Sequence, residues 1–204
     1  VEYLEGKQFS YREGSSRVRD IMIDAHLMLG RKFMAEKNYS KALDQFLLAQ
    51  VPEEEAGGSR FGNRNYQVDY FIGLAYEAMR SKSKARMYFQ MSTAREAMSS
   101  SYIRYYQGLS WLALGNKTEA EKAFNAIKAE GDRQLSHNET REVDFFAKFG
   151  EREAAYARLS NAYLLKGLGN KGLENIPEAR ANLKKAMELS SASLYSKSEL
   201  EGLD

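Results

Sequence analysis

Few residues of this sequence are arranged in a way that could perform chemistry, and the strongest candidate is a glycine-rich hexapeptide. Gly167-Leu168-Gly169-Asn170-Lys171-Gly172 formally matches the G-x-G-x-x-G pattern, whose backbone amides can face a pyrophosphate. That chemistry needs a β-strand before the motif and a helix that opens at its third Gly. Here helix-forming residues precede the motif and a turn is expected after it. The sequence therefore favours an extended turn over a nucleotide site.

The other candidates for phosphate, metal or nucleophilic chemistry are weaker. Gly115-Asn116-Lys117-Thr118 lacks the Gly-Lys adjacency and the upstream Gly of a phosphate-binding loop, so we interpret it as a helix boundary. His26 and His137 are the only histidines, they lie far apart, and there is no cysteine. Neither a metal site nor a Ser-His-Asp triad has a matching set of side chains. We expect no catalytic residue, no metal and no cofactor in this chain.

The composition is typical of a folded helical protein. Hydrophobic residues make up 43%, charged residues 28% and aromatic residues 12%, and good helix formers dominate a chain with only two prolines. The net charge of +2 is far from the concentrated positive charge of a dedicated nucleic-acid binder. No apolar run reaches the length of about 18 residues that a transmembrane helix needs. We expect a soluble all-α protein that binds neither nucleic acid nor membrane, with the cytoplasm and the periplasm both open.

One pattern of residues recurs along the chain and would position any functional side chain. A glycine is followed by an aromatic residue three positions later, by Ala twelve later and by Phe sixteen later. In two antiparallel helices, small residues allow close backbone approach and rings fill the space between the helices. We therefore expect each copy to form a helical hairpin. The three clear copies are Gly30, Phe33, Ala42 and Phe46; Gly73, Tyr76, Ala85 and Phe89; and Gly108, Trp111, Ala120 and Phe124.

A fourth copy is looser, and two registers are open for it. The first starts at Ala162, continues through Leu165 to Leu183, and requires an insertion of about five residues in the hairpin turn. The second starts at Gly167 without an insertion, but it puts Asn170 three positions after the small residue, where an apolar side chain is needed to fill the space between the helices. The tetrapeptide Leu-Gly-Asn-Lys, at 114–117 and again at 168–171, favours the first register because its Gly would cap the first helix in both copies. We therefore prefer Ala162.

The pattern organises the chain into a repeat domain over residues 16–190 with an end on each side. Repeats are expected at about 22–52, 65–98, 101–130 and 154–190. The insertion at 131–150, which holds Phe145, Phe146 and Phe149, predicts an additional helix. Residues 1–15 are expected to be a linker or the tail of a preceding domain, and 191–204 a C-terminal tail. The sequence opens at Val1 without a leader segment, so we interpret it as part of a longer or processed polypeptide.

The constellation of Gly, aromatic residue, Ala and Phe resembles the tetratricopeptide repeat, a family of helical hairpins that chiefly mediates protein binding and assembly. The resemblance covers roughly residues 18–190. It implies about four hairpins stacked into a right-handed α-solenoid with a concave inner face.

A second, narrower resemblance rests on five short segments. They are Tyr11-Arg12-Glu13-Gly14, Ala25-His26-Leu27 with Leu29-Gly30, Tyr70-Phe71-Ile72-Gly73, Tyr106-Gln107-Gly108-Leu109 and Val143-Asp144-Phe145-Phe146-Ala147. Together they are similar to the C-terminal repeat region of large bacterial proteins whose N-terminal part is glycoside-hydrolase-like. This resemblance implies that catalytic carboxylates would lie upstream of Val1 and that the repeats would form an appendage.

In the tetratricopeptide family, the inner face of each first helix lines the concave groove, and the matching positions can be read from this sequence. The candidates for binding are Arg31, Met34, Tyr70, Glu77, Tyr102, Tyr105, Tyr156 and Tyr163. The five tyrosines would each offer a rigid apolar body and a polar hydroxyl to a partner. Packing between repeats, or onto the missing part of the polypeptide, is the alternative. The Lys and Asn pair with which some family members clamp a terminal carboxylate is absent, because Leu27 and Arg31 stand there.

These observations predict a non-catalytic interaction or scaffold module that binds a protein or peptide, or its own N-terminal domain, through a Tyr-lined concave face. The alternative is a C-terminal helical appendage of a bacterial carbohydrate-active protein, which would pack on or oligomerise its catalytic domain. The oligomeric state stays open.

Overall fold

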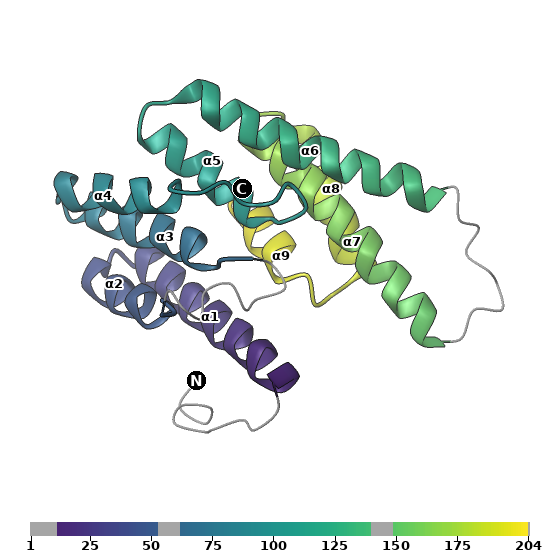
Figure 1. Cartoon of the computed structure of the whole chain (residues 1–204), viewed down its shortest axis with the longest axis horizontal. Coiled ribbons are helices and arrows are strands. Elements are labelled where there is room, and N and C mark those ends of the chain that lie inside the picture. The colour runs from purple at the N-terminus through teal and green to yellow at the C-terminus, as the bar shows by residue number, and fades with distance from the viewer. Residues whose placement is uncertain (1–11, 53–61, 140–148, 204) are drawn as a thin grey trace. The chain divides into compact units, whose positions relative to one another are not determined.

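The computed structural model describes residues 12–52, 62–139 and 149–203, and these are helical with no β-strand among them (Figure 1). The all-α prediction is confirmed. The helices are α1 (Arg12–Ala35), α2 (Tyr39–Leu48), α3 (Asn65–Ala78), α4 (Lys82–Ser92), α5 (Ile103–Ala113), α6 (Lys117–Glu139), α7 (Phe149–Gly172), α8 (Ile176–Leu189) and α9 (Leu194–Glu201).

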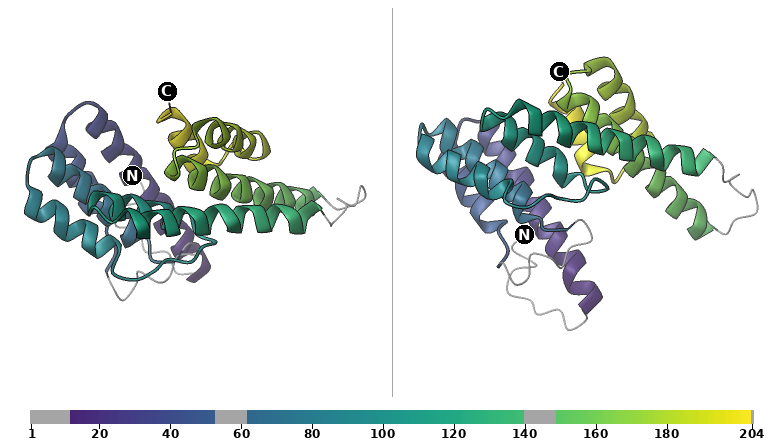
Figure 2. Two further views of the ribbon diagram at one scale, coloured as in Figure 1. Left: turned by 90° about the horizontal axis from the view of Figure 1, so that it is seen from above. Right: turned by 45° about the horizontal axis from the view of Figure 1, so that its top comes forward.

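The chain divides into two compact units. The first unit comprises Val1–Ala97 and Leu109–Asn116, and the second comprises Met98–Gly108 and Lys117–Asp204. In the first unit, α1 to α4 follow one another as packed neighbours (Figure 1). In the second unit, α6 packs along α7, and α7 and α8 both contact α9 (Figure 2).

The three glycine-and-phenylalanine pairs predicted from the sequence hold their hairpins together. A Cβ atom added at Gly30, Gly73 or Gly108 would overlap the ring of the phenylalanine sixteen residues later. The ring therefore lies directly on the helix backbone, and only glycine leaves it that space. Within each hairpin the alanine at the twelfth position is buried as well. These buried side chains are Phe46, Phe89 and Phe124, with Ala42, Ala85 and Ala120.

The turns of the hairpins repeat the same backbone geometry. The residue seven positions after each small residue has a left-handed backbone. The backbone N–H of the residue that follows it donates a hydrogen bond to the carbonyl oxygen five residues earlier in the chain, at 2.8 or 2.9 Å. This is the helix ending in which a left-handed residue closes the last turn. The left-handed residues are Lys37, Arg80, Gly115 and Glu174, with φ of 60°, 61°, 83° and 63°.

That repeated turn fixes the register of the fourth hairpin at Gly167, so our preference for Ala162 was wrong. Glu174 lies seven residues after Gly167, and a Cβ atom at Gly167 would stand 2.8 Å from Leu183 Cγ. No insertion is needed. The second Leu-Gly-Asn-Lys segment does not end its helix, because α7 continues through it to Gly172.

Asn170 and Ala162 have different roles from those predicted. Asn170 is buried at the position three residues after Gly167, where we had expected an apolar side chain. Its Nδ2 donates a hydrogen bond to the carbonyl oxygen of Lys166 at 3.0 Å. Ala162 packs on the other side of α7, where its carbonyl oxygen would lie 2.7 Å from a Cβ atom at Gly131 of α6. Close contact between α6 and α7 explains why both helices carry small residues on their facing sides.

The insertion and the two ends also differ from the prediction. Residues 131–139 extend α6 instead of starting a separate helix, and Phe149 is the first residue of α7. Phe145 and Phe146 lie outside the described residues. Residues 12–15, expected in a linker, already belong to α1, and the expected C-terminal tail contains α9.

Polar side chains tie the helices of the first unit together. Arg64 is fully buried, and its Nη2 donates to Asp24 Oδ1 at 2.6 Å while its Nε donates to Gln67 Oε1 at 3.1 Å. A second ion pair, at 3.5 Å, joins Arg64 to Asp20. The guanidinium thus connects α1 to the start of α3, and its burial is compensated by two carboxylates.

Candidate protein-binding surfaces

The four predicted binding residues of the first unit remain accessible. Arg31, Met34 and Tyr70 are half-buried, and Glu77 is exposed. The guanidinium carbon of Arg31 lies 5.6 Å from the ring centroid of Phe71, and the Tyr70 ring lies 5.2 Å from the same centroid. The structure therefore brings Arg31 of α1 and Tyr70 of α3 to one aromatic residue. A cation over a ring face and a pair of rings edge to face are both favourable arrangements.

Glu77 lines a hollow of about 510 Å³ in the first unit. We call this the basic hollow, because three of its other lining residues are cations. It lies where α3 ends, α4 begins and the C-terminal half of α5 approaches them. Its remaining lining residues are Arg80, Lys82, Ala85, Arg86, Phe89 and Ala113.

The basic hollow was missed by our sequence reasoning, although a signal for it exists. Residues 78–95 contain no Asp or Glu, and Arg80, Lys82, Lys84 and Arg86 follow one another at every second position. Only the folded hairpin brings three of these four cations, one from the turn and two from one side of α4, around an apolar floor.

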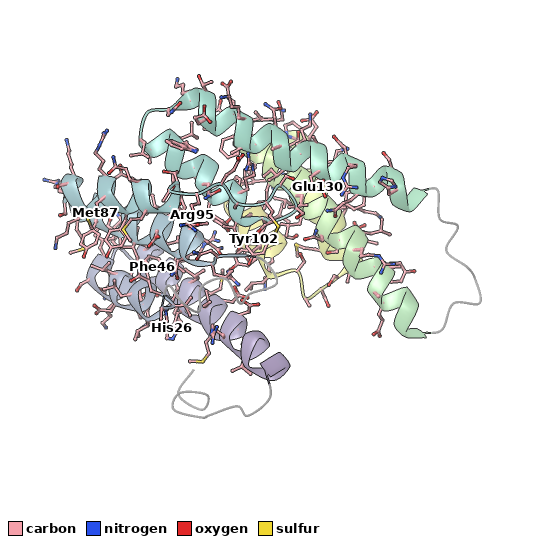
Figure 3. The ribbon with its side chains drawn as sticks, viewed as in Figure 1. His26, Phe46, Met87, Arg95, Tyr102 and Glu130 are labelled. Carbon is pink, nitrogen blue, oxygen red and sulfur yellow. The ribbon has the colours of Figure 1, made fainter. Side chains whose placement is uncertain are left out.

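The predicted tyrosines at the start of the third hairpin are not accessible. Tyr102 and Tyr105 each expose 2% of their surface. Tyr102, which Figure 3 labels, lies directly before α5. Its ring stacks on the ring of Tyr195 of α9, with centroids 4.4 Å apart. Tyr105 packs against Phe124 at 5.8 Å. Their prediction as open binding residues was wrong, because rings with this much burial form part of the core.

Helix α9 is fixed on this tyrosine face by a buried carboxylate. Glu199 exposes 5% of its surface and accepts a hydrogen bond from the Tyr106 hydroxyl at 3.1 Å. Lys171 Nζ lies 2.9 Å from the carboxylate of Glu199 and donates to the Glu199 carbonyl oxygen at 2.8 Å. The last helix of the second unit thus covers Tyr102 and Tyr106.

The two remaining predicted tyrosines lie on α7. Tyr156 is 41% exposed, and Tyr163 is half-buried. They are seven residues apart and so lie two turns apart along one side of the helix. Both were assigned to the inner face by counting from Ala162, so with Gly167 as the small residue they no longer stand at inner-face positions.

The residues with catalytic patterns take structural positions. The hexapeptide from Gly167 to Gly172 is the last part of α7, and its amides belong to a helix instead of opening one. His26 is buried, with its Nδ1 at 2.9 Å from Gln45 Oε1 of α2. Among the described residues, no group of three or more His, Cys, Asp or Glu side chains is placed to hold a metal ion.

Comparisons with protein families and with curated proteins found no relative of this chain. Within the described ranges, every helix is too short or too polar to cross a membrane.

Proposed function

We propose that this chain is a non-catalytic protein-interaction module built from tetratricopeptide-like hairpins, and that it holds a partner protein on the first unit. The candidate contact surface comprises Arg31, Met34, Tyr70 and Glu77, which we call the open inner face. The observation that carries the proposal is the contrast between the predicted inner-face residues of the first two hairpins and those of the third, among which Tyr70 and Tyr105 stand at the same repeat position. Tyr102 and Tyr105 are buried in the second unit, whereas the open inner face keeps accessible side chains.

The chemistry of the open inner face is that of protein recognition. Arg, Tyr and Met are enriched in protein interfaces because they combine a large contact area with hydrogen bonding or adaptable packing. Arg31 and Tyr70 are held against Phe71 and lose less conformational freedom on binding than unrestrained side chains would. The face is therefore partly ordered before a partner arrives.

A second candidate function is an appendage that docks on a catalytic domain of the same polypeptide. It is favoured by the apolar side chains exposed on α2 and α4, such as Leu48 at 59% and Met87 at 47%. Exposed apolar groups of this kind suit a permanent neighbour better than a transient one. In this case the partner is attached in cis and the contact surface includes the outer sides of α2 and α4.

The proposal is tested by photo-cross-linking from single positions. A photoreactive phenylalanine analogue replaces Glu77 on the open inner face in one variant, and it replaces Glu121 on the exposed side of α6 in the matched control. We expect one defined protein adduct from position 77 and none from position 121. An equal yield at both positions, or no adduct at either, would contradict the proposal. An adduct formed only within the same polypeptide would favour the second candidate.

A further inference from the structure

The basic hollow concentrates positive charge that the folded chain itself does not neutralise. Within the described part of the chain, Arg80, Lys82 and Arg86 form no side-chain ion pair or hydrogen bond, and all three are exposed. Glu77 is the single acidic residue in the lining. The walls of the hollow therefore carry three positive charges and one negative charge.

The position of these cations is unfavourable for the fold. Lys82 is the first residue of α4 and Arg86 lies one turn later, at the end of the helix where the peptide dipoles leave a partial positive charge. The first turn of α4 has no acidic residue to offset it. An anion bound in the hollow would relieve this accumulation of like charge. Such an accumulation is typical of a site that attracts a negatively charged ligand.

The floor of the basic hollow is apolar. Ala85 and Phe89 of α4 are buried there, and Ala113 of α5 completes the floor. A volume of about 510 Å³ lies in the range of small binding pockets, about 300–1,000 Å³. The hollow can therefore accept an apolar side chain as well as the charged groups around it.

We propose that the basic hollow binds an acidic peptide segment of a partner protein. Carboxylates of the segment lie against Arg80, Lys82 and Arg86, and a neighbouring aliphatic side chain lies on the floor formed by Ala85 and Phe89. This inference rests on the proposed function and names the chemistry of the partner. Because the floor is apolar and can take an aliphatic side chain, an acidic peptide fits the hollow better than a phosphate backbone does.

The test is a fluorescence anisotropy titration of the full chain with a labelled synthetic peptide in which pairs of Glu and Leu alternate. The same peptide with Gln in place of Glu and a labelled single-stranded oligonucleotide are titrated in parallel. The test variant is the double substitution K82Q/R86Q. The control is Lys84→Gln, which removes one positive charge from the same helix at a residue outside the lining. Lys84 Nζ lies 5.1 Å from the Tyr76 ring centroid.

We expect the Glu peptide to bind more tightly than the Gln peptide or the oligonucleotide. The double variant weakens binding about tenfold, because each exposed charge contributes about threefold. Lys84→Gln leaves the affinity within about twofold, since its effect is limited to long-range charge attraction. Glu77→Gln strengthens binding about threefold because it removes a repulsive carboxylate. A gain of affinity is informative because damage to the fold does not produce one.

Several results would overturn the inference. They are no binding of the Glu peptide, equal weakening by K82Q/R86Q and Lys84→Gln, or tighter binding of the oligonucleotide. The failure of this inference can be distinguished from a failure of the proposed function. If the partner cross-linked from position 77 binds K82Q/R86Q as tightly as the unmodified chain, the hollow is not its site, but the interaction module stands.

Discussion

The substitution Gly167→Ala tests the register of the fourth hairpin. A Cβ atom at this position would stand 2.8 Å from Leu183 Cγ, 2.9 Å from its Cδ2 and 3.2 Å from its backbone nitrogen. Carbon atoms in ordinary contact are about 3.5–4.0 Å apart, so the methyl group overlaps both the side chain and the backbone of α8. Overpacking of this kind costs about 1–3 kcal/mol. The backbone nitrogen cannot rotate away, which puts the cost in the upper part of that range.

The expected change in stability has a definite sign. Ala is favoured over Gly in a helix interior by about 1 kcal/mol, so the net loss at Gly167 is about 1–2 kcal/mol. If Ala162 were the hairpin residue instead, Gly167 would be free of this contact and Gly167→Ala would increase stability by about 1 kcal/mol. Urea unfolding followed by circular dichroism distinguishes these outcomes. An unchanged or increased free energy of unfolding would refute the Gly167 register.

A double-mutant cycle with Leu183→Ala attributes the loss to the predicted contact. Leu183→Ala alone lowers the free energy of unfolding by about 2–5 kcal/mol, because it leaves a cavity in the core. It also removes the two carbon atoms that Gly167→Ala would overlap. In the double variant the additional cost of Gly167→Ala therefore falls by about 1 kcal/mol or more. Additive effects would mean that the two positions do not touch.

Three further predictions concern other contacts. Arg64→Ala lowers the free energy of unfolding in urea by about 3–5 kcal/mol, since it leaves two carboxylates of α1 without their buried partner. Tyr195→Ala removes the ring stacked on Tyr102 and lowers stability by about 3 kcal/mol, and hydrogen exchange in α9 rises above that in α8. The hydrogen bond from Arg133 lowers the pKa of Glu130 below its usual range. Ionised Glu130 therefore stabilises the fold at pH values above the usual carboxyl pKa, and this stabilisation is lost as the pH falls through the lowered pKa. In urea unfolding, the difference in free energy of unfolding between the unmodified chain and Glu130→Gln should therefore shrink on acidification.

Local periodicity made the hairpins predictable. The spacing from Gly30 to Phe46 is repeated twice with the same residue types, and a ring on a glycine is a contact between residues near in sequence. The fourth register failed because we judged Asn170 too polar to fill the space between the helices. In the structure its amide donates to the Lys166 carbonyl in the same helix, so burial leaves that donor satisfied.

Contacts between residues distant in sequence were not predictable in the same way. Tyr102 has the residue type and the position of a binding residue. Only its contact with Tyr195 shows that it is covered, and Tyr195 lies on a helix where we had expected a tail. The basic hollow depends on α3, α4 and α5 together, so its charges were visible in the sequence but its shape was not. Glu77 was chosen for its repeat position, and the structure adds the cations beside it.

The central claim is that the first unit holds a protein partner around the open inner face and the basic hollow. Hydrogen–deuterium exchange of the chain, with and without the partner cross-linked from position 77, tests it most directly. We predict slower exchange in the C-terminal turns of α3 and the first turns of α4, with no change in α6. Protection confined to α6, or equal exchange everywhere with saturating partner, would contradict the claim.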